Sequence, residues 1–325
     1  MLVYLIRRLS QAALVVAVMG TIVFLSMYAI GNPIDLLAAQ DASDAEKAEL
    51  ARQLGLDRPI WEQFLIFAGN AMRGDLGKSF VYNEPTLRLI LQRLPATLEL
   101  ALTALVFSVA LGIPLGVYAG LKPDSWMSRT IMSGSILGFS LPNFWIGLML
   151  ILFFAVELKW LPASGRGETV DLLGVPVSFL TWDGLRHLFL PALTLSLYKA
   201  ALVVRLARAG TREVVMQDYV RFARAKGLSY RRIVLVHVVK NMMIPVVTVL
   251  GLEFGSMIAF AVVTETVFAY PGMGKLLIDS INRLDRPVIV AYLMFTVLLF
   301  VIINLIVDLI YAAIDPRVRL VEAKG

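Results

Sequence analysis

Long apolar stretches constrain this chain more than any other feature. Each is close to or above the ~20 residues that a helix needs to cross the hydrocarbon core of a bilayer. They lie at Leu9–Ile30, Ala96–Ala119, Thr130–Val156, Leu188–Leu206, Met242–Phe268 and Val288–Ala313. These stretches predict an all-α integral membrane protein with six transmembrane helices.

The composition excludes several other classes of protein. Hydrophobic residues make up 58% of the chain and charged residues 17%, whereas a soluble domain has roughly 25% charged residues. The chain is therefore not an ordinary soluble enzyme, a disordered protein or a nucleic-acid-binding protein. Its apolar runs are long rather than short and alternating, which argues against a β-barrel. The absence of cysteine excludes disulfides, thiolate metal sites and cysteine nucleophiles.

The distribution of Lys and Arg predicts the orientation in the membrane. The net charge is +6, and the densest group of basic residues lies in the segment 207–241. The first outside loop, Gly31–Pro95, carries more acidic than basic residues. Because short cytoplasmic loops carry an excess of Lys and Arg, both termini are predicted to be cytoplasmic.

The spans divide the chain into four parts. The first apolar run exceeds the 7–15 residues of a signal peptide core, so it is interpreted as an uncleaved span. The predicted parts are an N-terminal transmembrane helix (1–30), an extracytoplasmic loop (31–95), a core of five spans with the cytoplasmic loop 207–241 (96–314), and a cytoplasmic tail (315–325).

Two short helices are expected in the extracytoplasmic loop. Ser43–Leu54 begins with a capping residue and an acidic first turn, and Gly55 follows it. Pro59–Met72 begins with proline and carries apolar residues at helical spacing, including Trp61 and Phe64. These helices either pack on the membrane bundle or lie at the membrane interface.

The chain has no convincing nucleotide-binding or catalytic motif. Gly77–Ser79 has the end of a phosphate-binding loop, but Met72 stands where that motif requires glycine. Gly274–Lys275 is followed by Leu276 instead of Ser or Thr. The two histidines, His187 and His237, form no recognisable metal or protease pattern. We therefore expect no enzyme activity and no metal site, and ATP-driven transport would need a separate ATPase.

Few ionisable residues lie within the predicted spans. Such residues face the bundle interior, each other or water, because a charge near the bilayer centre costs at least ~2.5–3.5 kcal/mol. They are Glu99, Lys199, Glu253, Glu265 and Asp308. For Lys199 and Glu253 the sequence leaves two roles open, a structural ion pair or the lining of a pathway.

Glycine and proline residues predict where the spans pack closely and where they bend. Glycines at four-residue spacing, as in Gly112, Gly116 and Gly120, indicate helices that pack closely. Pro142, next to Asn143, interrupts the run Thr130–Val156 and predicts a kink or break that lines a cavity.

The cytoplasmic loop has the most informative local pattern. Tyr219–Lys226 is expected to be a short helix that Gly227 ends, followed by a second helix that enters the membrane. Phe222 and the neighbouring alanines leave a small apolar face among basic residues. This compact element is either a positive anchor or a docking site for another protein.

The loop Asp218–Pro245 closely resembles the coupling loop of ABC-importer permease subunits. It is most similar to the dipeptide, oligopeptide and nickel branch, and the long first outside loop is typical of the first of its two permease subunits. Similar motifs run through most of the chain, at Leu54–Pro59, Gly74–Gly77, Pro95–Glu99, Gly112–Gly116, Thr264–Phe268, Pro271–Gly274, Asp285–Pro287 and Asp315–Arg317.

One part of the loop departs from the general family pattern. The family carries Glu-Ala-Ala six to four residues before its glycine, and Arg221, Phe222 and Ala223 stand there in this chain. Only Ala223 and Gly227 are retained. A contact with an ATPase therefore cannot rely on a carboxylate at position 221.

The resemblance implies the fold and partners of a type I importer. A second homologous permease would complete the pathway, two ATPases would bind ATP and Mg²⁺, and an extracytoplasmic binding protein would deliver substrate. This chain would hold no cofactor and no nucleic acid, and would lie in the bilayer of the bacterial inner membrane. The coupling residues would be Asp218, Tyr219, Arg221, Ala223, Arg224, Ala225, Lys226 and Gly227, and a re-entrant element at the outer mouth would contain Pro271, Gly272 and Gly274.

The substrate is less constrained than the mechanism. Di- or oligopeptides are expected, with nickel or glutathione as alternatives that share this pattern. Phe139, Asn143 and Glu265 are the predicted pathway residues. A transporter driven by an ion gradient is a further alternative, but it would need inverted repeats and paired midplane ionisable groups that the sequence does not display.

Overall fold

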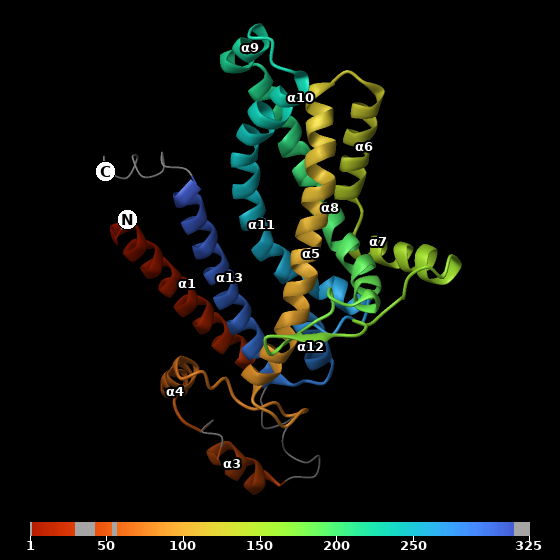
Figure 1. The fold of residues 1–325 in the computed structure, drawn as a ribbon. Helices are drawn as coiled ribbons and strands as arrows, with labels where there is room; N and C mark the ends of the chain where they lie inside the picture. The colour runs from red at the N-terminus through yellow and green to blue at the C-terminus, as the bar shows by residue number, and fades with distance from the viewer. Residues whose placement is uncertain (1, 30–42, 54–56, 315–325) are drawn as a thin grey trace. The chain divides into compact units, whose positions relative to one another are not determined.

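The computed structural model describes residues 2–29, 43–53 and 57–314, and these residues are mainly helical (Figure 1). Their elements are α1 (Leu2–Ala29), α3 (Asp44–Gln53), α4 (Ile60–Met72), α5 (Thr86–Leu121), α6 (Trp126–Ser140), α7 (Asn143–Leu150), the π-helix η1 (Ile151–Glu157), β1 (Val170–Leu172), β2 (Val175–Val177), α8 (Trp182–Val215), α9 (Asp218–Ala225), α10 (Tyr230–Arg232), the π-helix η2 (Ile233–Val239), α11 (Lys240–Val267), α12 (Met273–Asn282) and α13 (Arg286–Ile314). Gly55, the tail 315–325 with its Asp315–Arg317 motif, and the side chain of Asp308 lie outside the described part.

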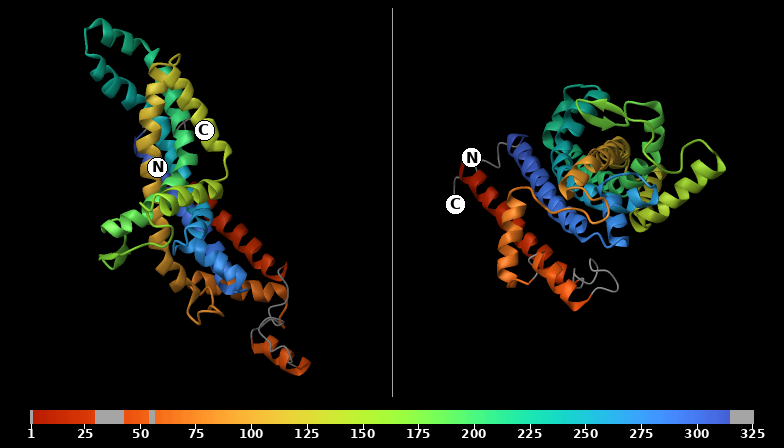
Figure 2. Two further views of the ribbon diagram at one scale, coloured as in Figure 1. Left: turned by 90° about the vertical axis from the view of Figure 1, so that its right-hand side faces the viewer. Right: turned by 90° about the horizontal axis from the view of Figure 1, so that it is seen from below.

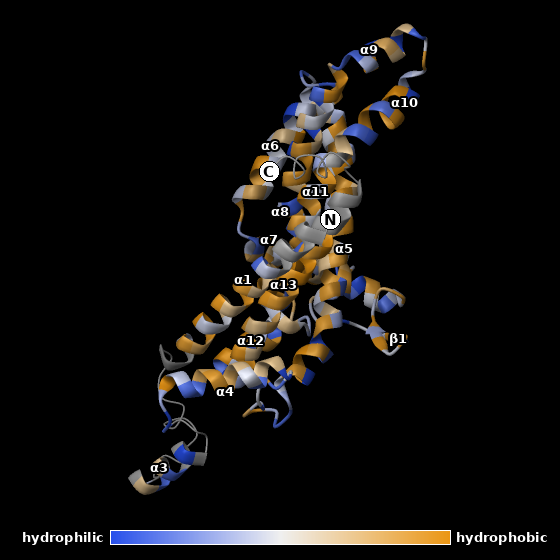
Figure 3. Cartoon of the chain, turned by 90° about the vertical axis from the view of Figure 1, so that its left-hand side faces the viewer, coloured by the Kyte–Doolittle hydropathy of each residue, from blue (hydrophilic) through white to orange (hydrophobic). Residues whose placement is uncertain are grey.

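The described residues contain four helices that are long and apolar enough to cross a membrane. These are α5, α8, Pro245–Val267 of α11 and Arg286–Val307 of α13, and a fifth span results if α6 and α7–η1 are counted together. The apolar part of α1, Ser10–Ser26, is shorter. Figure 3 shows the apolar character of these helices. A helical membrane protein is thus confirmed, whereas six spans and cytoplasmic termini stay predictions.

The third predicted span is broken. Trp126–Ser140 and Asn143–Glu157 meet at an angle of 106°. Leu141 takes an extended backbone with ψ 136°, as expected for a residue that precedes a proline. The interruption predicted at Pro142 is therefore confirmed, and it is a sharp turn rather than a mild kink.

The chain divides into two compact units. The first comprises Met1–Gln92 and Leu277–Val301. In it, the ring of Phe24 on α1 lies 5.3 Å from the ring of Phe64 and 5.5 Å from that of Phe67, both on α4. The predicted helix Pro59–Met72 therefore exists and packs on α1, with Pro59 as its N-cap.

Two further details of the first unit agree with the sequence analysis. The side chain of Ser43 accepts from the backbone N–H of Glu46, and the Glu46 carboxylate accepts from that of Ser43, which forms a capping box for α3. The buried carboxylate of Asp285 accepts from Ser79 Oγ at 2.5 Å and from the N–H of Phe80 at 3.1 Å. Gly77–Ser79 thus leads into a turn, and no helix follows it as in a phosphate-binding loop.

The second unit comprises Arg93–Leu276 and Ile302–Gly325. Its main helices are α5, α6, α8 and α11, and two views of the ribbon show α8 running beside α5 and α11 (Figures 1 and 2). A two-stranded antiparallel hairpin, β1–β2, follows η1, with Val170 opposite Val177.

Glycine allows α5 and α8 to approach closely. A Cβ atom at Gly112 would lie 2.6 Å from that of Val203, and one at Gly116 would lie 2.6 Å from that of Ala207. By contrast, a Cβ at Gly134 on α6 would meet nothing within 4 Å. The expected close packing is therefore found along α5, where the helix backbones touch.

Candidate functional site

Helix α9 is the predicted cytoplasmic element, and its boundaries agree with the sequence. It runs from Asp218 to Ala225, and Gly227 follows with a φ of +76°. This left-handed conformation suits glycine and lets the N–H of Leu228 reach the carbonyl of Ala223 at 3.3 Å. A helix with a glycine stop is thus confirmed.

One face of α9 is anchored to its own chain. Val220 and Ala223 are buried in an apolar cluster with Val214, Ile233 and Val238. The last two belong to η2, which continues directly into α11. Helix α9 is therefore packed on the segment that leads into α11.

The other face of α9 is open. The side chains of Tyr219 and Phe222 are 43% and 62% exposed, and Lys226 Nζ lies 4.6 Å from the centre of the Phe222 ring. Partial burial raises the pKa of the Tyr219 phenol. The remaining predicted coupling residues, Asp218, Arg221, Arg224, Ala225 and Gly227, are exposed as well. Apart from the buried Ala223, the structure gathers the predicted coupling residues on one accessible surface.

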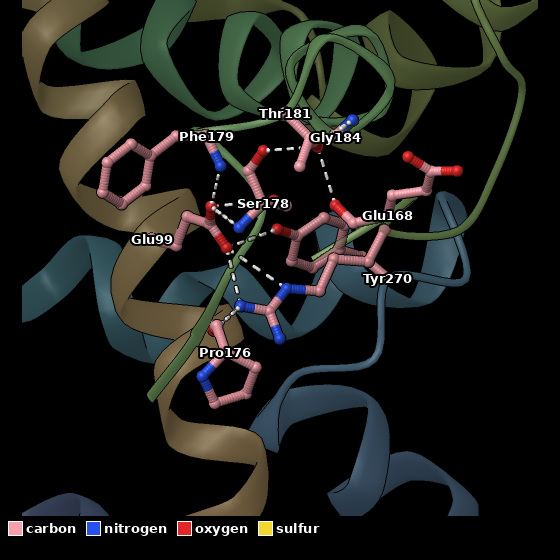
Figure 4. A network of polar contacts seen from close by, with 9 residues as sticks. Glu99, Glu168, Pro176, Ser178, Phe179, Thr181, Gly184 and Tyr270 are labelled. Atoms are coloured by element: carbon pink, nitrogen blue, oxygen red, sulfur yellow. Dashed lines mark hydrogen bonds and ion pairs between the residues drawn. The ribbon is translucent and has the colours of Figure 1, made fainter. Parts of the chain in front are cut away.

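A second polar site surrounds Glu99 on α5 (Figure 4). One carboxylate oxygen accepts from Ser178 N–H and Oγ, both at 2.7 Å, and from Phe179 N–H at 2.6 Å. The other accepts from Arg166 Nη2 at 2.8 Å and from the Tyr270 hydroxyl at 3.3 Å. With Arg166 Nε at 3.2 Å, this buried carboxylate accepts from six donors. Its charge is therefore compensated.

The Glu99 site ties the β1–β2 hairpin to the helices. Arg166 also donates to the carbonyl of Pro176 at 2.7 Å, so one guanidinium links the hairpin to α5. Burial, and next the negative charge of Glu99, raise the pKa of the Tyr270 phenol. The geometry describes a structural clamp with a neutral tyrosine.

Glu265 is enclosed near the end of α11. Its side chain is 0% exposed, and its carboxylate accepts from Thr97 Oγ1 at 2.6 Å and Lys275 N–H at 3.0 Å. The backbone at Gly272 and Gly274 lies so close that an added Cβ would meet this carboxylate. The structure therefore brings Glu265 together with the predicted outer-mouth glycines, and its carboxylate faces the protein interior in this conformation.

Lys199 on α8 and Glu253 on α11 are partners. Lys199 Nζ contacts Glu253 Oε2 and donates to Ser256 Oγ at 2.8 Å. Ser256 Oγ also donates to Glu253 Oε2 at 2.9 Å. The Lys199 side chain is nearly buried, but that of Glu253 is 28% exposed. The ion pair left open by the sequence is present, and its carboxylate remains accessible.

The other predicted pathway residues, Phe139 and Asn143, have different contacts from those of Glu265. Phe139 on α6 is 43% exposed and stacks on Tyr198, with ring centres 4.6 Å apart. The Oδ1 atom of Asn143, at the start of α7, is buried and has no hydrogen-bond partner among the described residues. A role of Phe139, Asn143 and Glu265 in a pathway stays a prediction.

Sequence reasoning did not find several residues of these sites. Arg166, Ser178 and Tyr270 around Glu99 were missed, as were Tyr198 and Arg205 near Phe139. One signal was available, because a carboxylate or cation in a span requires a partner. The partner could not be named, since the contacts of Glu99 span up to 171 residues along the chain.

Comparisons with known proteins agree with this architecture. The family described as "Binding-protein-dependent transport system inner membrane component" matches residues 112–320. The N-terminal family of the same transport systems matches residues 1–101. This chain belongs to that family. It is thus a membrane component of a binding-protein-dependent transport system.

Similar curated proteins are permeases. The chain is 40% identical over 302 residues to a di/tripeptide transport system permease protein, DppB, of Pseudomonas aeruginosa, which covers 89% of this chain and 90% of the relative. It is 36% identical to the dipeptide permease DppB of Escherichia coli K12, over 98% of this chain and 99% of the relative. The glutathione permease GsiC of the same strain is 40% identical, with the same two coverages.

A solved structure supports the fold. The inward-facing MetNI methionine ABC transporter has a chain that aligns with a TM-score of 0.56 and 16% identity, covering 70% of this chain and 97% of that chain. At this identity the likeness concerns the fold alone, which is that of an ABC-importer permease.

Proposed function

We propose that this chain forms half of the translocation pathway of an importer for di- or oligopeptides. The observation that carries the proposal is the high identity, over nearly the whole chain, to permeases named for di/tripeptide and dipeptide transport. A glutathione permease is similarly related, so glutathione is the second candidate substrate. A transporter driven by an ion gradient is not favoured.

The proposed complex contains a second permease, two ATPases and an extracytoplasmic binding protein. ATP and Mg²⁺ bind to the ATPases, and this chain holds no cofactor. The complex lies in the bacterial inner membrane, with six spans and both termini of this chain in the cytoplasm. Pro271, Gly272 and Gly274 belong to a short element at the outer mouth.

Helix α9 is the proposed point of energy input. Its outer face carries two exposed aromatic rings, Tyr219 and Phe222, between the cations Arg221, Arg224 and Lys226. Aromatic side chains with a cationic rim suit a groove on another protein. Its inner face is packed on η2, so docking at α9 moves α11.

Uptake by the reconstituted complex tests the substrate. The complete complex is placed in vesicles, and accumulation of radiolabelled dialanine is measured with and without ATP and binding protein. We expect uptake that requires both and that unlabelled di- and tripeptides inhibit. Uptake with a proton or sodium gradient and no ATP would contradict the proposal. Inhibition by glutathione but not by other peptides would favour the second substrate.

The Phe222→Ala variant tests the docking surface. We expect the ATPases to dissociate more readily in size-exclusion chromatography, and uptake to fall at least about tenfold because an interface anchor is lost. Tyr230→Ala is the matched control, since Tyr230 is an equally exposed aromatic residue of the same loop that lies beyond Gly227. Equal effects of the two substitutions would show that α9 is not the docking element.

A further inference from the structure

Charged and aromatic side chains form a continuous row within the second unit. Arg205 Cζ lies 4.7 Å from the ring centre of Phe139, and Phe139 stacks on Tyr198 at 4.6 Å. Lys199 Nζ lies 5.2 Å from the Tyr198 ring centre and contacts Glu253. One cation therefore stands at one end of the row, and a carboxylate stands at the other.

Both ends of the row have unused binding capacity. The hydrogen bonds to the Glu253 carboxylate go to Oε2, and no described residue donates to Oε1. Among the described residues, Arg205 has a ring contact but no hydrogen-bond acceptor or ion-pair partner. Both side chains are partly exposed. A charge exposed on a membrane helix does not face lipid, because the cost is several kcal/mol. These groups therefore face water, a second subunit or a polar ligand.

The two ends of the row belong to separate turns of α8. Lys199, which holds Glu253, and Arg205 are six positions apart on this helix, which corresponds to about 9 Å along a helix axis. An extended peptide spans about 3.3–3.6 Å per residue, so its two charged ends can contact groups on separate turns.

We propose that this row is a binding site, inside the membrane domain, for the charged termini of a di- or tripeptide. The α-ammonium binds Glu253 Oε1, and the α-carboxylate binds the Arg205 guanidinium. The exposed edge of Phe139 lies between them and contacts the peptide side chains without selecting among them. The inference rests on the proposed function, and it adds the groups of the substrate that this chain recognises.

Lys199 has a supporting role in this site. Its bond to Oε2 compensates part of the carboxylate charge and fixes the orientation in which Oε1 is free. Lys199 is therefore a positioning residue, whereas Glu253 and Arg205 contact the ligand. The two cations and one anion leave the empty site with one net positive charge, and a zwitterionic ligand adds no net charge while its carboxylate pairs with Arg205.

Binding to the complete permease–ATPase complex in nanodiscs, without binding protein or nucleotide, tests the site. The probes are trialanine, N-acetyl-trialanine, trialanine amide and alanine, and their dissociation constants are measured by saturation-transfer NMR. For the wild type we expect trialanine to bind at least about tenfold more tightly than either blocked peptide, because each blocked end loses a charge-assisted bond. Alanine is expected to bind weakly.

Variants assign the two ends. Glu253→Gln should weaken the binding of trialanine about tenfold and leave the binding of N-acetyl-trialanine unchanged. Arg205→Gln should also weaken the binding of trialanine about tenfold, but it should leave the binding of trialanine amide unchanged. Glu253→Asp keeps the charge and should restore part of the preference for a free ammonium group. Arg212→Gln, an exposed arginine further along α8, is the matched control and should behave like the wild type.

Several results would overturn the site. Equal losses for free and blocked peptides would show that Lys199–Glu253 is a purely structural pair. Dissociation of the two permeases in Arg205→Gln, with unchanged peptide binding by the assembled fraction, would assign Arg205 to the subunit interface. Uptake of dialanine is measured in parallel. If the wild type transports no peptide, the proposed function fails; if it transports peptide but binds blocked and free peptides alike, only this site fails.

Discussion

Two glutamates on the same helix have opposite environments. Glu265 is fully enclosed, and donors of its own chain occupy its carboxylate. Glu253, twelve residues earlier on α11, is partly exposed, and no described residue donates to one of its oxygens. Residue type and helix are the same, so neither determines the role. The number and kind of the surrounding donors decide it.

The kind of donor also determines whether a ligand can compete. Glu265 is held by the backbone N–H of Lys275, which follows the turn at Gly272–Gly274. It is also held by the hydroxyl of Thr97, which itself accepts from the N–H of Met273 at 2.8 Å. Glu253 is held by the flexible side chains of Lys199 and Ser256. Such side chains can change partners within a fixed backbone, so Glu253 can exchange ligands and Glu265 cannot.

Alanine at the two positions should separate these roles most strongly. We expect Glu265→Ala to lower the free energy of unfolding by about 4 kcal/mol, because it leaves buried donors without an acceptor and creates a cavity. Glu253→Ala should cost less, about 1–2 kcal/mol, since Glu253 itself is partly solvated although the nearly buried Lys199 loses its anionic partner. Chemical denaturation of the purified chain in detergent measures both. Equal costs would remove the distinction between the two glutamates.

Alanine at Gly272 tests the enclosure of Glu265 from the other side. An added Cβ would meet the carboxylate, so Gly272→Ala should destabilise the protein by about 2–3 kcal/mol. Gly134→Ala is the matched control, because a Cβ there meets nothing within 4 Å. It should be neutral or slightly stabilising, as alanine favours a helix. A neutral Gly272→Ala would show that Glu265 has room to move.

Tyr270 donates to a third carboxylate, that of the buried Glu99, and its titration tests the burial of that site. Because burial and Glu99 raise the pKa of this phenol above its ordinary value of 10.0, it ionises in the unfolded chain before it ionises in the folded one. Its contribution to stability is therefore complete below pH 10 and decreases as the pH rises. We expect a loss of up to about 1.4 kcal/mol per pH unit there.

Tyr270→Phe removes this titration. At pH 7 to 8 the variant should differ from the wild type by less than about 1 kcal/mol, because only one long hydrogen bond is lost. Above pH 10 it should lose stability less steeply than the wild type. Denaturation curves between pH 7 and 11 measure the two slopes, and parallel slopes would contradict the burial of Tyr270.

Local features of the structure followed from the sequence. The helix Asp218–Ala225 with its stop at Gly227, the helix cap at Ser43 and the break at Pro142 each agree with the prediction. In all three cases the signal and the structure lie within a few residues, because caps, glycine turns and proline restrictions act on the adjacent backbone.

The candidate sites were predicted less completely. The sequence identified Glu99, Lys199, Glu253 and Glu265 as groups that need partners, but it named none of their partners. It also grouped Glu265 with Phe139 and Asn143, whereas the contacts of Glu265 come from Thr97 and Lys275. These pairs join separate helices, and their register depends on the packing of the whole unit.

The sequence by itself determined that this chain is a helical membrane protein and which loop carries the short helix with its glycine stop. Hydrophobicity, charge distribution and capping are local properties, and they need no knowledge of distant residues. The tertiary structure alone decided which charges are satisfied. Arg166 pairs with Glu99, while Arg205 and one oxygen of Glu253 have no hydrogen-bond or ion-pair partner in the part of the chain that the structure describes. The physical reason is that a charge is compensated by atoms within about 3 Å, and only folding brings those atoms together.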